Sequence, residues 1–232
     1  MKRSEAVLII LFICTFIIDS FLAGTGNLEG RYLSKGLLMP LLLVYFFVAT
    51  NTSVNDDVSK SKLYIYCALL FSCIGDIFLL GQGSLNFMCG IGAFLIAQVF
   101  YILFFITVRR LHKNNTVFIF VAAIFILAYL ITLNSLLWQK VHAQQFVIPV
   151  FAYSIALGLM LFAAINTYNA TLRNNIARYF ISGAIIFVLS DSMIALNNFY
   201  LTKPLPGFYI MFTYCLAQFL LVTGAVKFIR QQ

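Results

Sequence analysis

The chain alternates between long apolar runs and short polar connections along its whole length. Eight of the runs approach the ~20 residues that a helix needs to cross the hydrocarbon core of a bilayer. They predict transmembrane helices over 6–23, 36–51, 63–81, 86–108, 116–136, 146–166, 177–197 and 207–227. The predicted fold is therefore all-α, a polytopic membrane helix bundle, with residues 1–232 forming a single integral membrane domain.

The first run is expected to stay in the protein as a helix. A positively charged start followed by an apolar stretch is also typical of a signal peptide, but Asp19 interrupts the run and no small-residue cleavage site precedes Thr25.

Composition excludes a soluble fold. Only 9% of the residues are charged and 62% are hydrophobic, whereas soluble domains carry roughly 25% charged residues. The net charge of +8 does not indicate nucleic acid as a partner, because the basic residues lie in short connections and do not form one stripe.

These basic residues predict the orientation of the bundle. The termini and even-numbered connections hold eleven of the fifteen: Lys2, Arg3, Lys60, Lys62, Arg109, Arg110, Lys113, Arg173, Arg178, Lys227 and Arg230. The odd-numbered connections are assigned the other four: Arg31, Lys35, Lys140 and Lys203. Because Lys and Arg favour the cytoplasmic side, both termini are predicted to be cytoplasmic.

Short matches between the two halves of the chain indicate a parallel four-plus-four internal repeat, although matches of this length also arise by chance in apolar sequence. The matched pieces are Ile74-Gly75-Asp76 with Leu189-Ser190-Asp191, Ala97-Gln98 with Ala217-Gln218, and Met39-Pro40 with Ile148-Pro149.

Three acidic residues, Asp19, Asp76 and Asp191, lie inside apolar runs. An ionisable group at membrane depth costs at least ~2.5 kcal/mol, so a functional role is the default interpretation, with a structural hydrogen bond to a neighbouring helix as the alternative. We expect function for Asp76 and Asp191. For Asp19, which is nearer a helix end, both readings stay open.

Asp76 and Asp191 are predicted at the same depth, roughly 20 Å from the cytoplasmic boundary at 1.5 Å per residue. Two carboxyl groups in a poorly solvated site are not easily ionised together, because desolvation and mutual repulsion oppose the second charge. One proton held between them would supply a general acid and a general base.

Other polar residues form pairs on helix faces. Gln98 and Tyr101 are spaced i,i+3, and Tyr214 and Gln218 are spaced i,i+4. They are expected to line a cavity or to form interhelical hydrogen bonds. Lys35, at the outer mouth of the second span, is expected to meet a lipid phosphate or to snorkel to the interface.

Several classes of enzyme are disfavoured. The two histidines, His112 and His142, lie in or beside connections on opposite sides, so no histidine-rich zinc site is expected within the membrane, and neither a metal nor a cofactor is predicted. No Gly-x-Ser-x-Gly elbow is present, and Cys73 replaces the first glycine of the Gly-x-Gly-Asp motif of intramembrane aspartyl proteases.

Five runs carry a family resemblance: 35–43 (KGLLMPLLL), 71–80 (FSCIGDIFLL), 94–101 (FLIAQVFY), 183–199 (GAIIFVLSDSMIALNNF) and 213–218 (TYCLAQ). In order and spacing they resemble the YhhN family of membrane proteins, which includes the lysoplasmalogenases of the TMEM86 type. Gly-Ala-x-x-Phe-x-x-Ser-Asp is the most specific piece. The chain departs from the family pattern at Gly36, where proline is expected, and at Gln98, where histidine is expected. These departures bear on substrate preference and on activity.

The resemblance implies hydrolysis of the vinyl ether bond of lysoplasmalogens to a fatty aldehyde and a glycerophospho-alcohol. Asp76 and Asp191 would share the acid and base roles, in an order that the sequence leaves open. The implied partners are a lysophospholipid or other single-chain lipid and the bilayer itself, and the expected location is the bacterial inner membrane. The candidate substrate-binding residues are Lys35, Gln98, Tyr101, Ser190, Asn198, Tyr214 and Gln218.

Two other functions stay open from the sequence. In a small proton-coupled transporter, the same aspartates would relay protons while the two halves rock around them. A lipid-binding protein without activity is the third reading, reached if Gln98 marks a site that has lost its chemistry. Oligomeric state and headgroup preference are not predicted.

Overall fold

The computed structural model describes residues 2–51, 56–109, 116–143, 146–168 and 174–232, and every regular element within them is an α-helix. Each predicted span corresponds to one helix: α1 (Arg3–Thr25), α2 (Leu28–Thr50), α3 (Asp56–Leu80), α4 (Ser84–Arg109), α5 (Thr116–Ala143), α6 (Val147–Ile165), α7 (Asn174–Phe199) and α8 (Gly207–Ile229). Arg110, His112, Lys113 and Arg173, as well as the side chains of Asp56, Asp57 and Arg109, lie outside the described part of the chain.

Helix α2 differs most from its prediction, since it begins at Leu28 and not near residue 36. Asn27 caps it, its side-chain oxygen accepting a hydrogen bond from the backbone N–H of Gly30 at 3.1 Å. The placement of Arg31 and Lys35 in a connection was therefore wrong. Both lie within the helix, where Asp19 and Asp76 supply the opposite charges that make polar residues tolerable at membrane depth.

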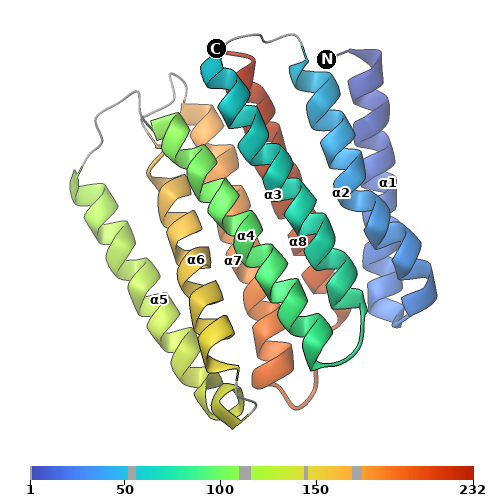
Figure 1. The fold of residues 1–232 in the computed structure, drawn as a ribbon, viewed down its shortest axis with the longest axis vertical. Helices are drawn as coiled ribbons and strands as arrows, with labels where there is room; N and C mark the ends of the chain where they lie inside the picture. Colours follow the sequence, from blue (N-terminus) through green and yellow to red (C-terminus); the bar gives the residue numbers. More distant parts are fainter. Residues whose placement is uncertain (1, 52–55, 110–115, 144–145, 169–173) are drawn as a thin grey trace.

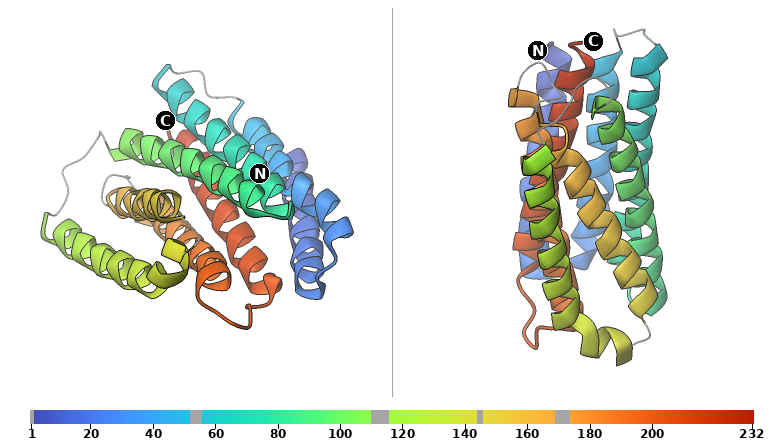
Figure 2. Two further views of the ribbon diagram at one scale, coloured as in Figure 1. Left: turned by 60° about the horizontal axis from the view of Figure 1, so that its bottom comes forward. Right: turned by 90° about the vertical axis from the view of Figure 1, so that its left-hand side faces the viewer.

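The helices run up and down along one common direction, with both termini at the same end of the bundle (Figure 1). Consecutive helices pack together, except that α4 packs on α6 while α5 lies at the edge against α6 and α7. Figure 2 shows α5 and α1 at opposite sides of the molecule. Neighbours α1–α2, α2–α3 and α3–α4 have counterparts in α5–α6, α6–α7 and α7–α8, but the internal repeat stays a prediction.

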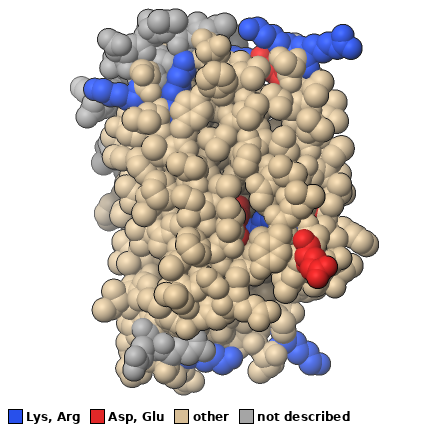
Figure 3. Space-filling view, turned by 45° about the vertical axis from the view of Figure 1, so that its right-hand side comes forward, with Lys and Arg blue, Asp and Glu red and all other residues tan. Residues whose placement is uncertain are grey.

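All eight helices are long and apolar enough to cross a membrane. Large apolar side chains such as Ile17 and Phe125 are exposed on the outer helices, at 60% and 72%. Such a surface is stable against lipid and would aggregate in water. In Figure 3 most of the Lys and Arg side chains in view lie at the two ends of the molecule, with few charged side chains between them. The protein is therefore a multi-pass integral membrane protein.

Small residues allow the helices that carry Asp76 and Asp191 to approach their neighbours closely. A Cβ atom on Gly75, the neighbour of Asp76, would come within 2.6 Å of the Phe94 ring on α4. On α7, a Cβ atom on Gly183 would lie 2.9 Å from the side chain of Leu221 and 3.2 Å from the carbonyl oxygen of Ala217 on α8. Close backbone approach at small residues is the usual way that helices pack in lipid.

Candidate active site

Asp76 lies on α3, four residues before the last residue of the helix, and its side chain is almost fully buried. The hydroxyl group of Tyr214 on α8 donates a hydrogen bond to Oδ2 at 2.7 Å. The ammonium group of Lys35 on α2 lies 3.2 Å from Oδ1. Three helices therefore meet at this carboxyl group.

The position of Lys35 corrects the sequence-based expectation. Its side chain is 6% exposed and pairs with Asp76, so it does not snorkel to the interface. Its contact with a lipid phosphate stays a prediction. Because α2 begins early, Lys35 lies about two turns inside the helix, and a buried ammonium group at that depth needs a counter-charge nearby. Asp76 provides it.

Asp191 lies on α7 and has different surroundings. Tyr153 on α6 donates a hydrogen bond from its hydroxyl group to Oδ2. Among the described residues, no lysine or arginine forms an ion pair with this carboxyl group. The two acids thus differ in charge environment, since one faces a cation and the other a phenol.

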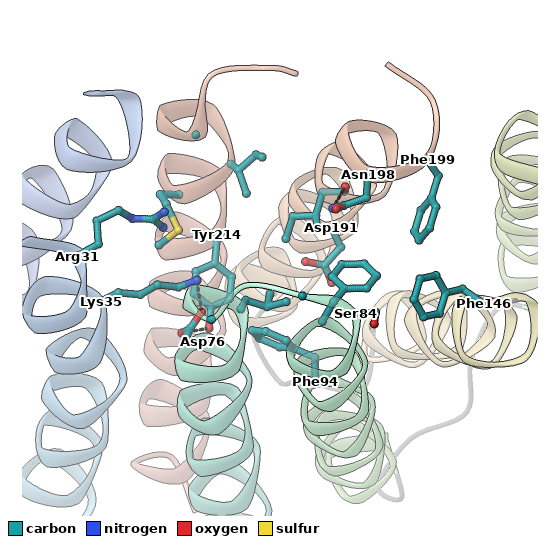
Figure 4. A pocket seen from close by; sticks show the side chains of 18 residues that line it. Arg31, Lys35, Asp76, Ser84, Phe94, Phe146, Asp191, Asn198, Phe199 and Tyr214 are labelled. Carbon is teal, nitrogen blue, oxygen red and sulfur yellow. Dashed lines mark hydrogen bonds and ion pairs between the residues drawn. The ribbon is translucent and has the colours of Figure 1, made fainter. Parts of the chain in front are cut away.

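Both acids line a single cavity of about 480 Å³. Lys35, Asp76 and Tyr214 lie on one side of it, and Asp191 and Asn198 on the other (Figure 4). The lining reaches Gly83, Phe146 and Gly207 at the end of the bundle opposite the termini. Figure 3 shows a hollow in the side of the molecule with acidic and basic atoms at its floor. Asp76 and Asp191 therefore face a shared, sheltered space.

A smaller apolar pocket of about 50 Å³ adjoins this cavity. Asp191 borders both spaces, together with Leu79, Phe87, Phe94, Ile194 and Phe199. The rest of its wall is Ile91, Val150, Tyr153 and Ala195. Asp191 is thus at the boundary between a space with charged side chains and one that is almost wholly apolar.

The other predicted substrate-binding residues divide into two groups. Asn198 and Tyr214 line the cavity along with Lys35. Tyr101 and Gln218 are buried behind it, where the Tyr101 hydroxyl group donates to Oε1 of Gln218 at 2.5 Å and Nε2 of Gln218 donates to Ser72 at 3.1 Å. These two residues form the interhelical bonds that were the alternative to substrate contact.

Ser190 and Gln98 do not line the cavity either. Ser190 donates to the carbonyl oxygen of Ile210 at 3.0 Å and so links α7 to α8. Gln98 is fully buried and lies near the hydroxyl group of Tyr153, but neither polar atom of its side chain meets a hydrogen-bond partner in the described residues. Its amide therefore stands beside the tyrosine that contacts Asp191.

Asp19, whose role was open, is buried outside the cavity lining. Its Oδ1 accepts a hydrogen bond from Ser34 at 2.7 Å and lies 3.7 Å from Nε of Arg31. It joins α1 to α2, as the structural interpretation of this residue expects. Its ion-pair partner Arg31 lines the cavity.

Sequence reasoning missed Tyr153 and Arg31. Nothing in the chain distinguishes Tyr153 from the other eleven tyrosines, because its importance comes from α6 packing beside α7. Arg31 was counted only as a topology determinant. Its spacing of four residues from Lys35 places both on one face of a helix, and this signal becomes visible once α2 is extended.

No group of three or more His, Cys, Asp or Glu side chains suited to a metal ion occurs in the described part of the chain. The polar groups that line the cavity are two carboxyl groups, a lysine, an arginine, a tyrosine, the hydroxyl group of Ser84 and the amide of Asn198.

The sequence was compared with known proteins. The model of the YhhN family matches residues 30–225. Lysoplasmalogenase TMEM86A of Homo sapiens is 30% identical over 192 residues, which are 82% of this chain and 76% of the relative. Lysoplasmalogenase TMEM86A of Bos taurus is 27% identical, with 82% of this chain and 76% of the relative covered.

A bacterial relative is the lysoplasmalogenase of Mycobacterium tuberculosis (strain CDC 1551 / Oshkosh), 27% identical over 74% of this chain. The match spans 64% of that relative's length. No solved structure matches the chain.

Proposed function

Because the chain belongs to the YhhN family, we propose that it is a hydrolase that cleaves the vinyl ether bond of lysoplasmalogen-type lysophospholipids. The products are a fatty aldehyde and a glycerophospho-alcohol. The relatives named lysoplasmalogenase support the substrate class. The observation that carries the proposal is that Asp76 and Asp191 line one cavity beside an apolar pocket.

The reaction needs one acid and one base. The acid protonates the alkene carbon that is not bonded to the ether oxygen, which gives an oxocarbenium ion. Water then adds to the cationic carbon as it loses a proton to the base. The resulting hemiacetal collapses to aldehyde and alcohol, so one water is consumed per bond broken. Carboxyl pairs serve the same purpose around the similar cation of glycoside hydrolysis.

We assign the acid role to Asp191 and the base role to Asp76. Lys35 and Tyr214 give Asp76 a cation and a hydrogen-bond donor, which are the surroundings of a carboxylate. Asp191 has no such cation among the described residues and borders the apolar pocket, where a neutral carboxylic acid costs less than a charge. The vinyl ether joins glycerol to the hydrocarbon chain, so it would lie where the polar and apolar spaces meet, at Asp191.

We also place substrate entry at the end of the bundle opposite the termini, where the connections border the cavity. With cytoplasmic termini, this end faces away from the cytoplasm. A single-chain lipid would then reach the site from the outer leaflet.

A pair of matched lipids tests the function. Purified protein is incubated with a 1-alkenyl lysophospholipid and with its saturated 1-alkyl analogue, and fatty aldehyde is measured. Aldehyde is expected from the vinyl ether alone, because only an alkene can be protonated to the required cation. No aldehyde from either lipid would overturn the proposal. Uptake of a small solute or lipid by proteoliposomes, lost when the proton gradient is collapsed, would instead favour a proton-coupled transporter. That function stays a prediction from the sequence.

A further inference from the structure

The cavity contains two cations, and only one of them pairs with a candidate catalytic acid. Lys35 is held by Asp76 at 3.2 Å. Arg31 lies one helical turn earlier on the same face of α2, nearer the end at which the cavity is lined by connections. In Figure 4 its guanidinium group extends from α2 toward α8, above Lys35 in the view.

The donors of Arg31 are largely unused by the protein. Its contact with Asp19 is an ion pair at 3.7 Å, longer than a hydrogen bond, and Nε lacks a hydrogen-bond partner within the described chain. The side chain is 17% exposed although it lies between helices. A guanidinium group has five N–H donors in a rigid planar fork that fits two oxygens of a phosphate.

Asp19 keeps this guanidinium group in place without saturating it. The carboxyl group is fully buried, and Ser34 fixes its Oδ1 with a hydrogen bond of 2.7 Å. It therefore holds Arg31 and offsets part of its charge, while Arg31 also lines the cavity. A fixed, partly neutralised arginine at a cavity wall suits an anion with a single negative charge.

We infer that Arg31 binds the phosphate of the substrate headgroup. This inference rests on the proposed function and names the part of the site that recognises the substrate. The order of groups across the cavity runs from Arg31 to the Lys35–Asp76 pair and then to Asp191, which borders the apolar pocket (Figure 4). This order matches that of phosphate, glycerol, vinyl ether and the first carbons of the chain in a lysoplasmalogen. Lys35 serves Asp76 and not the headgroup.

The test measures binding, so that it does not depend on turnover. The ligands are a saturated 1-alkyl lysophospholipid, the 1-alkylglycerol with the same chain but no phosphate, and sn-glycerol 3-phosphate, and affinities are measured calorimetrically in detergent. The unmodified protein is expected to bind the 1-alkyl lysophospholipid more tightly than the alkylglycerol. Arg31→Gln is expected to weaken binding of the lysophospholipid about 10- to 100-fold and to leave binding of the alkylglycerol unchanged. Arg31→Lys should recover part of the loss, because it restores charge without the fork.

Two further variants distinguish a loss of phosphate binding from a loss of the folded structure. Arg31→Gln leaves Asp19 without its cation, so the double variant Asp19→Asn, Arg31→Gln removes both charges and should fold normally while still lacking the phosphate preference. Lys140→Gln, at an exposed lysine of the same end that does not line the cavity, should bind like the unmodified protein.

Equal affinity of the unmodified protein for the two alkyl lipids, or an undiminished phosphate preference in the folded double variant, would overturn the inference. So would a preference confined to glycerol phosphate, because the site would then hold a free phosphate ester and not a lipid headgroup. Phosphate-dependent binding without cleavage of the vinyl ether would contradict the hydrolase proposal but would still support an anion site at Arg31.

Discussion

Two carboxyl groups of the same residue type lie in one cavity with different neighbours. Asp76 is held by Lys35 and Tyr214, whereas Asp191 is held by Tyr153. Ionisation at this depth depends on the groups in direct contact with each carboxyl group. In the proposed mechanism, the acid and base roles therefore depend on residues of three other helices.

Removal of either carboxyl group should stop the reaction. Asp76→Asn and Asp191→Asn are each expected to lower aldehyde release by at least ~10²-fold, the usual contribution of a positioned acid or base. Glu29→Gln is the matched control, because Glu29 is an exposed acid at the same end of the bundle. The measurement is turnover of a 1-alkenyl lysophospholipid by protein whose fold has been checked by circular dichroism. Turnover near that of the unmodified protein in both variants would refute the assignment.

The ion pair between Lys35 and Asp76 should matter for stability as well. Lys35→Met leaves a buried carboxylate unpaired, which is expected to lower the free energy of unfolding by about 3–5 kcal/mol. Adding Asp76→Asn should restore much of this loss, because the uncompensated charge is then gone. Denaturant titrations of the two single variants and the double variant measure the coupling, and strictly additive losses would contradict a direct ion pair.

At the scale of the helices, close approach decides where the site forms. Gly75 lets α3 contact α4 beside Asp76, and Phe94, which it touches, is part of the cavity wall. The ring has little room to move, because it also packs against Tyr214 in a T-shaped arrangement with centroids 5.9 Å apart. Packing between these helices and the position of the Asp76–Tyr214 bond are thus linked.

Gly75→Ala should disturb both packing and activity. The added methyl group would meet the Phe94 ring at 2.6 Å, so the expected loss of stability is about 1–3 kcal/mol. Gly36→Ala is the control, since a Cβ atom there meets nothing within 4 Å and alanine favours the helix. Thermal unfolding and aldehyde release report the two effects. A Gly75→Ala protein as stable and active as Gly36→Ala would show that the contact at Phe94 does not constrain the site.

At the scale of the whole molecule, the cavity and the termini lie toward opposite ends of the bundle. For the substrate entry proposed above, the side on which the termini lie thus decides from which leaflet the lipid comes. The bias of basic residues toward the terminal end is the reason to place that end in the cytoplasm.

Labelling of single cysteines in a cysteine-free variant checks this orientation. In intact cells, Lys203→Cys is expected to react with a membrane-impermeant maleimide, because Lys203 is exposed in the connection before α8. Gln231→Cys, at the exposed C-terminal end, should react only after permeabilisation. The reverse pattern would invert the bundle and move substrate entry to the cytoplasmic leaflet.

The sequence by itself determined the eight helices and the acids inside them. In lipid every backbone N–H and C=O must be satisfied within its own segment, so an apolar run of sufficient length becomes a helix whatever its neighbours are. A carboxyl group in such a run is conspicuous because burying it is costly. Asp76 and Asp191 could therefore be selected without coordinates.

Only the tertiary structure decided which side chains meet. These helices are apolar on nearly every face, so their sequences carry little information on which face turns inward or how far one helix slides along another. The extension of α2 moved Arg31 and Lys35 from a connection into the cavity wall, and the packing of α6 on α7 brought Tyr153 to Asp191. These contacts join distant segments of the chain, and packing between helices, not the character of any one segment, fixes them.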